Sequence, residues 1–156
     1  MERTSAGLVM YRQREGRLEI FLAHPGGPFF ARKDDGHWTI PKGEVEPGED
    51  YVATAIREFK EEVGIEIDRA SSLLDLGSIR QKGGKVVRAW AVERDADVAR
   101  ECRSNTFTME WPRGSGKFQE FPEVDRAEFF PIVEARKKIK DTQVPLLDRL
   151  EAELRR

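Results

Sequence analysis

One amphipathic segment constrains the fold of this chain more than any other: "GEVEPGEDYVATAIREFKEEVGI", residues 43–65. At about 100° per residue, its apolar side chains form one stripe with small residues beside it: Val52, Ile56, Phe59 and Val63, flanked by Ala53 and Ala55. Glu49 and Asp50 supply acids where a helix begins, and Gly64 stands where a left-handed residue ends one. The segment predicts a helix from about residue 50 to 63 that packs through one face.

Three glutamates gather on the opposite face of this helix, close to its C-terminal end: Glu58, Glu61 and Glu62. Like charges three or four residues apart cost roughly 0.2–0.5 kcal/mol per pair, and the last turn carries the negative end of the helix dipole. A bound divalent cation would offset both costs. A solvated helix face is the alternative, but such faces usually interleave charges of opposite sign.

The loop before the helix favours the cation. "PKGEVEPGE" contains two glycines and two prolines, so it can bring backbone carbonyl oxygens close to the carboxylates. Carbonyl and carboxylate oxygens together suit Mg²⁺ or Mn²⁺ rather than zinc. The sequence therefore predicts a site for a hard divalent cation at this helix.

The rest of the chain alternates extended and helical patterns. Apolar alternation and turn residues predict strands at 5–13, 18–25, 38–41, 73–81, 85–93, 106–111 and 128–132. Further helices are expected within 94–105 and at 133–139 and 143–156, and long loops at 26–38 and 112–127. This order predicts an α+β fold with a mixed central sheet and helices on its faces.

Composition limits the class of protein. The 156 residues suit one domain, 1–156. The net charge of −2 gives no general attraction to nucleic acid or to acidic membranes, and no apolar run approaches the ~20 residues of a membrane span. The N-terminus does not have the pattern of a signal peptide. A single cysteine, Cys102, fits a reducing cytoplasm and has no nearby base that would make it catalytic.

The segment also matches a family pattern. Gly43, then Glu49, then "REFKEEVGI" at 57–65 resembles the Nudix box, G-x5-E-x7-R-E-U-x-E-E-x-G-U, in which U is a bulky aliphatic residue. Every charged and glycine position is filled, and the one departure, the aromatic Phe59, lies on the apolar stripe. The resemblance implies an α/β/α sandwich over the whole chain. It also implies hydrolysis of a diphosphate linkage in a nucleoside diphosphate derivative, with divalent cations, usually Mg²⁺.

The resemblance assigns roles to the box residues. Glu58, Glu61 and Glu62 match the metal-binding acids, which the backbone carbonyl of Gly43 often joins. Arg57 resembles the arginine that pairs with a box acid and orients it, and Glu49 resembles a structural or helper acid. Phosphoryl transfer needs positioning and charge neutralisation more than covalent help, which agrees with this set.

Many family members add an acid from a distal loop ahead of a late strand. Glu123, six residues before Phe129, has the matching spacing and is preferred, with Glu120 as the rival. Both acids could instead simply solvate a loop. The general base is left open among Glu58, Glu62 and Glu123, because family members differ.

Several basic and aromatic residues are candidates for contacts with substrate. Lys42 in "IPKGE", with Trp38 nearby, resembles dinucleoside-polyphosphate hydrolases, and an added cation suits a polyanionic chain. A second phosphate contact is expected from Arg80, Lys82 and Lys85, although a solvated turn explains them equally well. Trp38 and Trp111 are candidate stacking platforms for a base. The two histidines, His24 and His37, are expected to make polar contacts only.

Four functions follow, in this order. The first is a Mg²⁺-dependent hydrolase of a dinucleoside polyphosphate such as diadenosine tetraphosphate. The second is a MutT-type pyrophosphohydrolase that removes damaged nucleoside triphosphates. RNA decapping is disfavoured by the charge, and a non-catalytic sensing module is disfavoured because such modules typically lose box acids. The expected partner is a small nucleotide, with no membrane and no stable nucleic-acid partner, in a monomer or homodimer.

Overall fold

A mixed β-sheet forms the central layer of the protein. The computed structural model describes residues 3–156, and the strands of this sheet are β1 Thr4–Arg14, β2 Arg17–Pro25, β3 Lys42–Glu44, β4 Leu73–Arg80, β5 Val86–Glu93 and β8 Val124–Pro131. The strand order is β4-β5-β1-β2-β8, with β3 beside the first half of β1. β1 and β5 are parallel, whereas the other pairs are antiparallel. The predicted mixed sheet is confirmed.

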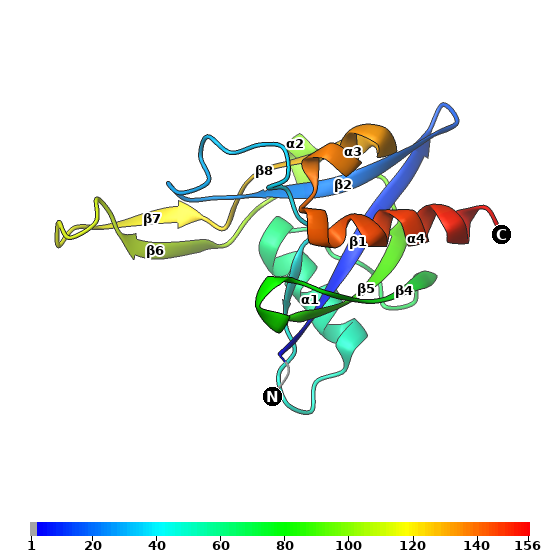
Figure 1. Cartoon of the computed structure of the whole chain (residues 1–156), viewed down its shortest axis with the longest axis horizontal. Helices are drawn as coiled ribbons and strands as arrows, with labels where there is room; N and C mark the ends of the chain where they lie inside the picture. The colour runs from blue at the N-terminus through cyan, green and yellow to red at the C-terminus, as the bar shows by residue number, and fades with distance from the viewer. Residues whose placement is uncertain (1–2) are drawn as a thin grey trace.

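Helices cover both faces of this sheet (Figure 1). α1 (Tyr51–Val63) packs on one face, and α3 (Ile132–Lys138) and α4 (Val144–Leu154) pack on the other. A short helix, α2 (Val98–Glu101), and two 3-10 turns, η1 (Lys82–Gly84) and η2 (Asp141–Gln143), complete the helical elements of residues 3–156. Within that range no helix combines the length and apolar character needed to cross a membrane. The result is the three-layer α/β/α sandwich that the box resemblance implies.

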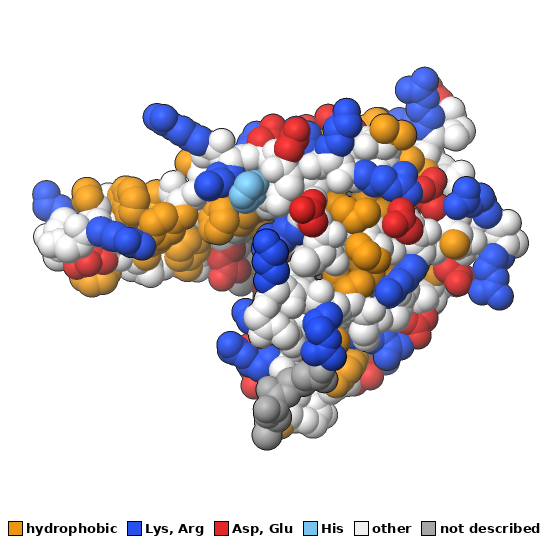
Figure 2. Space-filling view, in the orientation of Figure 1, with side chains coloured by type: hydrophobic (Ala, Val, Ile, Leu, Met, Phe, Trp, Pro, Cys, Tyr) orange, Lys and Arg blue, Asp and Glu red, His pale blue; other side chains and the backbone are white. Residues whose placement is uncertain are grey.

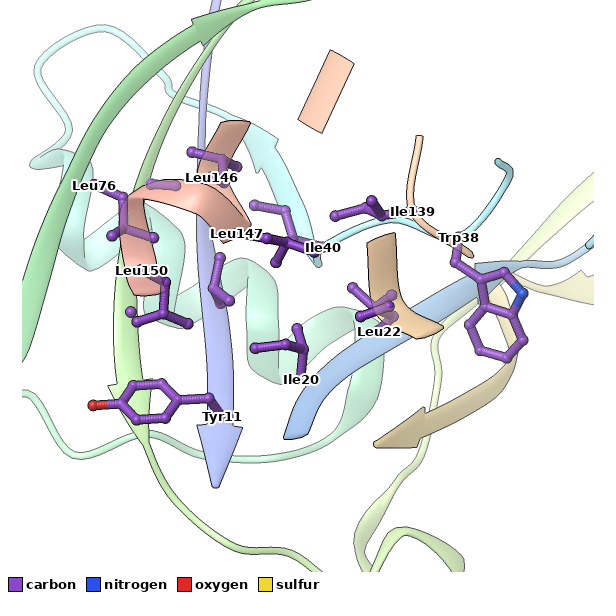
Figure 3. Packing of buried hydrophobic residues seen from close by; sticks show 14 of the residues in the cluster. Tyr11, Ile20, Leu22, Trp38, Ile40, Leu76, Ile139, Leu146, Leu147 and Leu150 are labelled. Atoms are coloured by element: carbon purple, nitrogen blue, oxygen red, sulfur yellow. The ribbon is translucent and has the colours of Figure 1, made fainter. Parts of the chain in front are cut away.

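Alternation along β1 explains why both faces are covered. Val9 and Tyr11 point into the core under α3 and α4, while Leu8 and Met10 point into the core under α1. Successive side chains of a strand face opposite sides, so a strand that is apolar on both sides needs a layer on each. Figure 3 shows the first core, where Leu146, Leu147 and Leu150 of α4 meet the sheet.

The first helix begins and ends at the predicted residues. The Asp50 carboxylate accepts a hydrogen bond from the Ala53 N–H at 3.1 Å, and Gly64 adopts a left-handed φ of 80°. The buried face is rotated from the predicted stripe. It consists of Thr54, Ala55, Phe59 and Val63, whereas Val52 and Ile56 are only partly buried and Ala53 is exposed. The rotation turns one flank of the helix, which carries Glu58 and Glu62, toward β3.

The prediction of a loop over 112–127 was wrong. β6 (Thr106–Glu110) and β7 (Phe118–Pro122) pair only with each other and form an arm that projects from the body in Figure 1. β8 then begins at Val124. Only 111–117 connects the two strands of the arm. Neither strand has a deeply buried face, so the apolar alternation that marks a strand in sequence is weak here.

Candidate active site

Arg57 organises the acids at the middle of α1. Its Nε donates to Glu49 Oε2 at 3.1 Å, and its Nη1 donates to Glu58 Oε1 and to Glu61 Oε1, each at 3.1 Å. These contacts raise the pKa of Arg57, with the hydrogen bond to Glu61 as the largest cause. One guanidinium therefore contacts three carboxylates, and the orienting role of Arg57 in a reaction stays a prediction.

Glu49 accepts hydrogen bonds from the loop before α1 as well as from Arg57. Its Oε1 accepts the backbone N–H of Glu46 at 3.0 Å, and this bond is the largest cause of its lowered pKa. Glu49 therefore stays ionised and ties the turn before α1 to Arg57. Its position fits the structural acid expected from the box.

Gly43 lies directly against the carboxylate of Glu58. A Cβ atom added at Gly43 would fall 2.0 Å from Glu58 Cδ and 2.2 Å from Glu58 Oε2. Gly43 is fixed in β3 by its pairing with Ala6 of β1, so the backbone has little freedom to retreat. Only glycine leaves room for the acid here, and the glycine brings backbone polar atoms beside the carboxylate.

Glu62 is the most perturbed acid of the helix. Its Oε2 accepts the backbone N–H of Lys42 at 3.3 Å. Burial, followed by the charge of Glu58, raises its pKa to about 8, although the Lys42 charge opposes this rise. Burial, followed by the charge of Glu61, also raises the pKa of Glu58. These carboxylates crowd one another without enough positive charge to balance them.

The structure brings Glu123, and not Glu120, to these acids. Glu123 lies between β7 and β8, and its charge contributes to the raised pKa of both Glu58 and Glu62. Backbone hydrogen bonds connect the region, since Asn105 N donates to Glu61 O at 3.2 Å and Glu123 N donates to Asn105 O at 2.8 Å. Glu120 lies opposite Thr108 within the exposed arm.

These oxygens suit a divalent cation. Within residues 3–156, no group of three or more His, Cys, Asp or Glu side chains is arranged so that it could hold a metal ion by itself. Mg²⁺ does not need one, because it typically takes one or two carboxylates and keeps waters or substrate phosphates as its other ligands. The raised pKa values of Glu58 and Glu62 and the space left by Gly43 fit such a partial site.

Positive charge stands next to the acids. Lys42 of β3 is half-buried, and its pKa is lowered first by burial and then by the charge of Lys140, with Lys85 adding to the effect. Lys82 and Lys85 lie exposed at the turn between β4 and β5, and Arg80 lies exposed at the end of β4. Sequence reasoning missed Lys140. It is 98 positions from Lys42, and no local pattern links the two.

The two predicted stacking tryptophans have different surroundings. Trp38 is 1% exposed, its Nε1 donates to Asp34 Oδ1 at 2.8 Å, and its ring lies 4.9 Å from that of Phe130. The prediction that Trp38 stacks on a substrate base was wrong, because its faces are covered. Trp111 is partly exposed and packs edge-on against Phe29 at 5.4 Å. It stands at the far end of β6, about 17 Å from the base of the arm at ~3.3 Å per residue.

The loop at 26–37 is pinned to the body. His24 is fully buried, with Nδ1 2.7 Å from Asp125 Oδ1 and Nε2 donating to the Lys33 carbonyl at 2.6 Å. His37 is partly exposed and bonds only locally, to the Asp35 carbonyl. Both histidines therefore make polar contacts, as expected, and within residues 3–156 neither is hydrogen-bonded to a box acid.

A cavity of about 110 Å³ opens beside Glu62, lined also by Cys102, Ser104 and Asp125. Burial raises the pKa of the Cys102 thiol to about 11, so this sulfur stays protonated and is a poor nucleophile. A larger groove of about 780 Å³ lies over α2 and β8 and touches none of the box acids. Its Arg12 is already paired with Glu19 and Asp95. Of the two, the smaller cavity is the one that a box acid, Glu62, lines.

Comparisons with known proteins identify relatives of this chain. The NUDIX domain family model matches residues 1–150. An asymmetrical bis(5'-nucleosyl)-tetraphosphatase of Caenorhabditis elegans is 48% identical over 61 residues, which are 39% of this chain and 40% of that protein. The enzyme of the same name from Sus scrofa is 40% identical over 105 residues, 60% of this chain and 67% of that protein. The chain thus spans less than half the length of the first of these relatives.

Solved structures extend the likeness to nearly the whole chain. A C. elegans Ap4A hydrolase in a binary complex has a TM-score of 0.66 and 28% identity, covering 97% of this chain and 98% of that one. The NUDIX domain of Shewanella oneidensis NrtR complexed with ADP ribose has a TM-score of 0.67 at 13% identity, covering 99% and 89%, which shows the fold alone. With the family match over residues 1–150, these findings mean that the chain belongs to the Nudix family.

Proposed function

We propose that this protein is a Mg²⁺-dependent hydrolase that cleaves a diphosphate linkage in a nucleoside diphosphate derivative. The lead substrate is a dinucleoside polyphosphate such as diadenosine tetraphosphate. The observation that carries the proposal is the meeting of Glu58 and Glu62 with Gly43 and Lys42, which combines crowded carboxylates with an adjacent cation. The likeness to proteins named asymmetrical tetraphosphatases supports the choice of substrate.

The groups proposed to hold the cation are the carboxylates of Glu58, Glu61, Glu62 and Glu123 and the backbone carbonyl of Gly43. Mg²⁺ would use one or two of these carboxylates, with water or substrate phosphates as its other ligands. When bound, Mg²⁺ polarises phosphoryl oxygens and lowers the pKa of a coordinated water. Mn²⁺ suits the same oxygen ligands. Arg57 keeps Glu58 and Glu61 oriented through their Oε1 atoms, so the Oε2 atom of each carboxylate remains available.

A carboxylate of this set takes the proton of the attacking water. Glu58, Glu62 and Glu123 are the candidates, and Glu62 combines burial with a raised pKa, which makes its ionised form a strong proton acceptor. As water attacks one phosphorus, the anhydride P–O bond breaks and the leaving phosphate takes up the negative charge. From diadenosine tetraphosphate this reaction gives ATP and AMP.

Basic side chains neutralise the phosphate chain. Lys42 stands beside Glu62, and the charge of Lys85 acts on Lys42. Arg80 and Lys82, exposed in β4 and the η1 turn, are proposed as further phosphate contacts. Trp111, at the far end of the arm, is also proposed to stack on a nucleobase of the substrate. A substrate with two nucleosides separated by several phosphates can span from the carboxylates to such a remote contact.

The test is a panel of substrates with Mg²⁺, each assayed with and without EDTA. It contains diadenosine tetraphosphate, 8-oxo-dGTP, ADP-ribose and a capped RNA. We expect EDTA-sensitive release of ATP plus AMP from the dinucleotide, faster than any product from the other three. Release from 8-oxo-dGTP alone would instead assign the chain to the MutT-type reaction. A relative named RNA pyrophosphohydrolase, 38% identical over 67 residues, justifies the RNA substrate in the panel.

A further inference from the structure

A buried glutamine joins three segments that are distant in sequence. Gln143, at the start of α4, has no exposed surface. Its Oε1 accepts the Ile40 N–H at 3.0 Å, and its Nε2 donates to Gln81 Oε1 at 2.9 Å. Its Nε2 also donates to Thr39 Oγ1 at 2.8 Å. Every polar atom of this side chain is used, so the contact is specific and costly to break.

Each of the joined segments carries a lysine a few residues away. Lys42 follows Ile40 by two residues. Lys85 closes the turn after Gln81, and the two are linked because Gln81 N donates to Lys85 O at 2.7 Å. Lys140 precedes Gln143 in the η2 turn, and its N–H donates to the Trp38 carbonyl at 2.9 Å. The Gln143 amide therefore fixes the three lysine-bearing backbones relative to one another.

The charges of these lysines converge without an ion-pair partner. Within residues 3–156, Lys42, Lys85 and Lys140 make no salt bridge, whereas neighbouring Lys138 is paired with Asp34 and Asp35. The charges of Lys140 and Lys85 both lower the pKa of Lys42, after the larger effect of burial. Folding thus brings three like charges together and leaves them unbalanced. In Figure 2, several Lys and Arg side chains lie along the edge of the body that faces the angle below the arm.

The carboxylates are also neighbours of Lys42. The Lys42 N–H donates to Glu62 Oε2 at 3.3 Å, and the charges of Glu62 and Glu58 oppose the lowering of the Lys42 pKa. A phosphate chain that reaches from the acids past Lys42 meets Lys85 and Lys140 next. Ammonium groups bind phosphate oxygens as strong, charge-assisted donors, and a polyanion removes the repulsion among them.

We propose that Lys42, Lys85 and Lys140, assembled around Gln143, form a subsite for the phosphates of the substrate that lie beyond those at the carboxylates. This inference rests on the proposed function and deepens it. Lys140 is the new phosphate contact and Gln143 is the positioning residue. The subsite favours chains of three or more phosphates over orthophosphate or pyrophosphate, since short anions do not reach all three lysines.

The test is binding of inorganic tripolyphosphate, measured by calorimetry in EDTA, so that neither turnover nor a nucleotide is needed. We expect tripolyphosphate to bind more tightly than orthophosphate. Lys140→Gln is expected to weaken tripolyphosphate binding by about three- to tenfold. The matched control is Lys137→Gln, an exposed lysine of α3 without a salt bridge, and it is expected to change binding by less than about twofold.

The positioning role of Gln143 is tested through its partner Gln81, which is only partly buried. Gln81→Met removes the acceptor for Gln143 Nε2 but keeps the side-chain volume. We expect this variant to weaken tripolyphosphate binding and to raise KM for diadenosine tetraphosphate about threefold, with kcat unchanged. A loss of kcat at unchanged KM would contradict the positioning role.

Two results would overturn the subsite. One is a wild-type protein that binds tripolyphosphate no better than orthophosphate. The other is a Lys140→Gln variant that binds it as well as Lys137→Gln does. The proposed function fails separately: if no nucleotide of the panel is hydrolysed but Lys140→Gln still weakens tripolyphosphate binding, the subsite stands and only the reaction is wrong.

Discussion

The α1 site and the β6–β7 arm differ in how tightly their side chains are packed. Around α1 the polar groups are partly buried and linked by hydrogen bonds, within the helix from Arg57 to Glu58 and Glu61, and to β3 from the Lys42 backbone to Glu62. Phe59 anchors the helix beneath them, with its ring 5.8 Å from that of Phe21. The arm has two strands that pair only with each other, and Phe118 at its far end is 68% exposed. Fixed charge is therefore located where packing is dense, and exposed aromatic surface is located where packing is sparse.

This difference separates two kinds of role. Phosphoryl chemistry requires carboxylates held in one geometry, which the body of the protein can provide. An isolated two-stranded hairpin adds little stability, so substitutions in it act mainly on what it touches. Substitutions in the body are therefore expected to change both stability and chemistry, whereas substitutions in the arm are expected to change mainly substrate contacts.

The largest effect is expected from Glu62→Gln. The amide keeps the shape of the side chain but removes the charge that the cation and the proton transfer require. We expect kcat for diadenosine tetraphosphate to fall by about 10²- to 10⁴-fold. The melting temperature in EDTA is expected to stay the same or rise, because the repulsion from Glu58 is gone.

The control for this variant is Glu66→Gln, an exposed acid that pairs only with Lys60, at 3.8 Å. It is expected to leave kcat unchanged. Turnover near the wild-type rate in Glu62→Gln would contradict the assignment of the α1 acids, however well the protein folds.

The next effect is on folding, in Trp38→Ala. Trp38 fills the core between β2 and α3 and contacts the rings of His24 and Phe130. Removing a buried tryptophan side chain typically costs about 3–5 kcal/mol, and we expect the free energy of unfolding, measured in urea, to fall by that amount. A loss below about 1 kcal/mol would mean that Trp38 is not part of the core.

Glu62 and Trp38 show what could and could not be predicted from the sequence. The roles expected of Glu58, Glu61 and Glu62 depend on spacing within one helix, which helical periodicity determines locally. The cap at Asp50 and the stop at Gly64 are likewise local signals, and both are confirmed. Trp38 was judged from its neighbours in sequence, but its burial comes from Ile139 and Phe130, about a hundred residues later.

Strand β7 and the role proposed for Lys140 could not be predicted from the sequence, for related reasons. β7 has no buried face, so its residues do not alternate in the way that reveals a strand. The role proposed for Lys140 depends on contacts between distant segments, those of Gln143 with Ile40 and Gln81 and that of Lys140 N with the Trp38 carbonyl. Glu123 was preferred to Glu120 because its spacing matched the family pattern. In the structure Glu120 lies in β7 and Glu123 lies between β7 and β8. The composition of the segment does not indicate this difference.

A smaller effect on catalysis is expected from Gly43→Ala. The new methyl group would fall 2.0 Å from Glu58 Cδ and must displace the carboxylate. A displacement of about 1 Å at a catalytic group can cost about 10²-fold in rate, so we expect kcat to fall by about ten- to a hundredfold. Glu44→Ala, at the exposed next position of β3, is the control. Equal rates for both variants would show that Glu58 need not contact residue 43.

The pH dependence of stability tests Glu62 without substrate or cation. Folding raises the pKa of Glu62 from 4.5 to about 8, so between these values the folded state holds a proton that the unfolded state has lost. Stability therefore falls as pH rises through this window. In EDTA, the melting temperature of the wild type is expected to decrease relative to that of Glu62→Gln from pH 5 to pH 9. Parallel curves for the two proteins would contradict the raised pKa.

The smallest effect on stability is expected from Trp111→Ala, which sharpens the contrast with Trp38. Trp111 contacts Phe29 at the end of the arm and is partly exposed, so the loss is expected to stay below about 1 kcal/mol. If Trp111 stacks on a base, KM for diadenosine tetraphosphate rises while kcat and tripolyphosphate binding do not change, because tripolyphosphate has no base. An unchanged KM would remove Trp111 from the substrate contacts and leave the arm without a part in the proposed reaction.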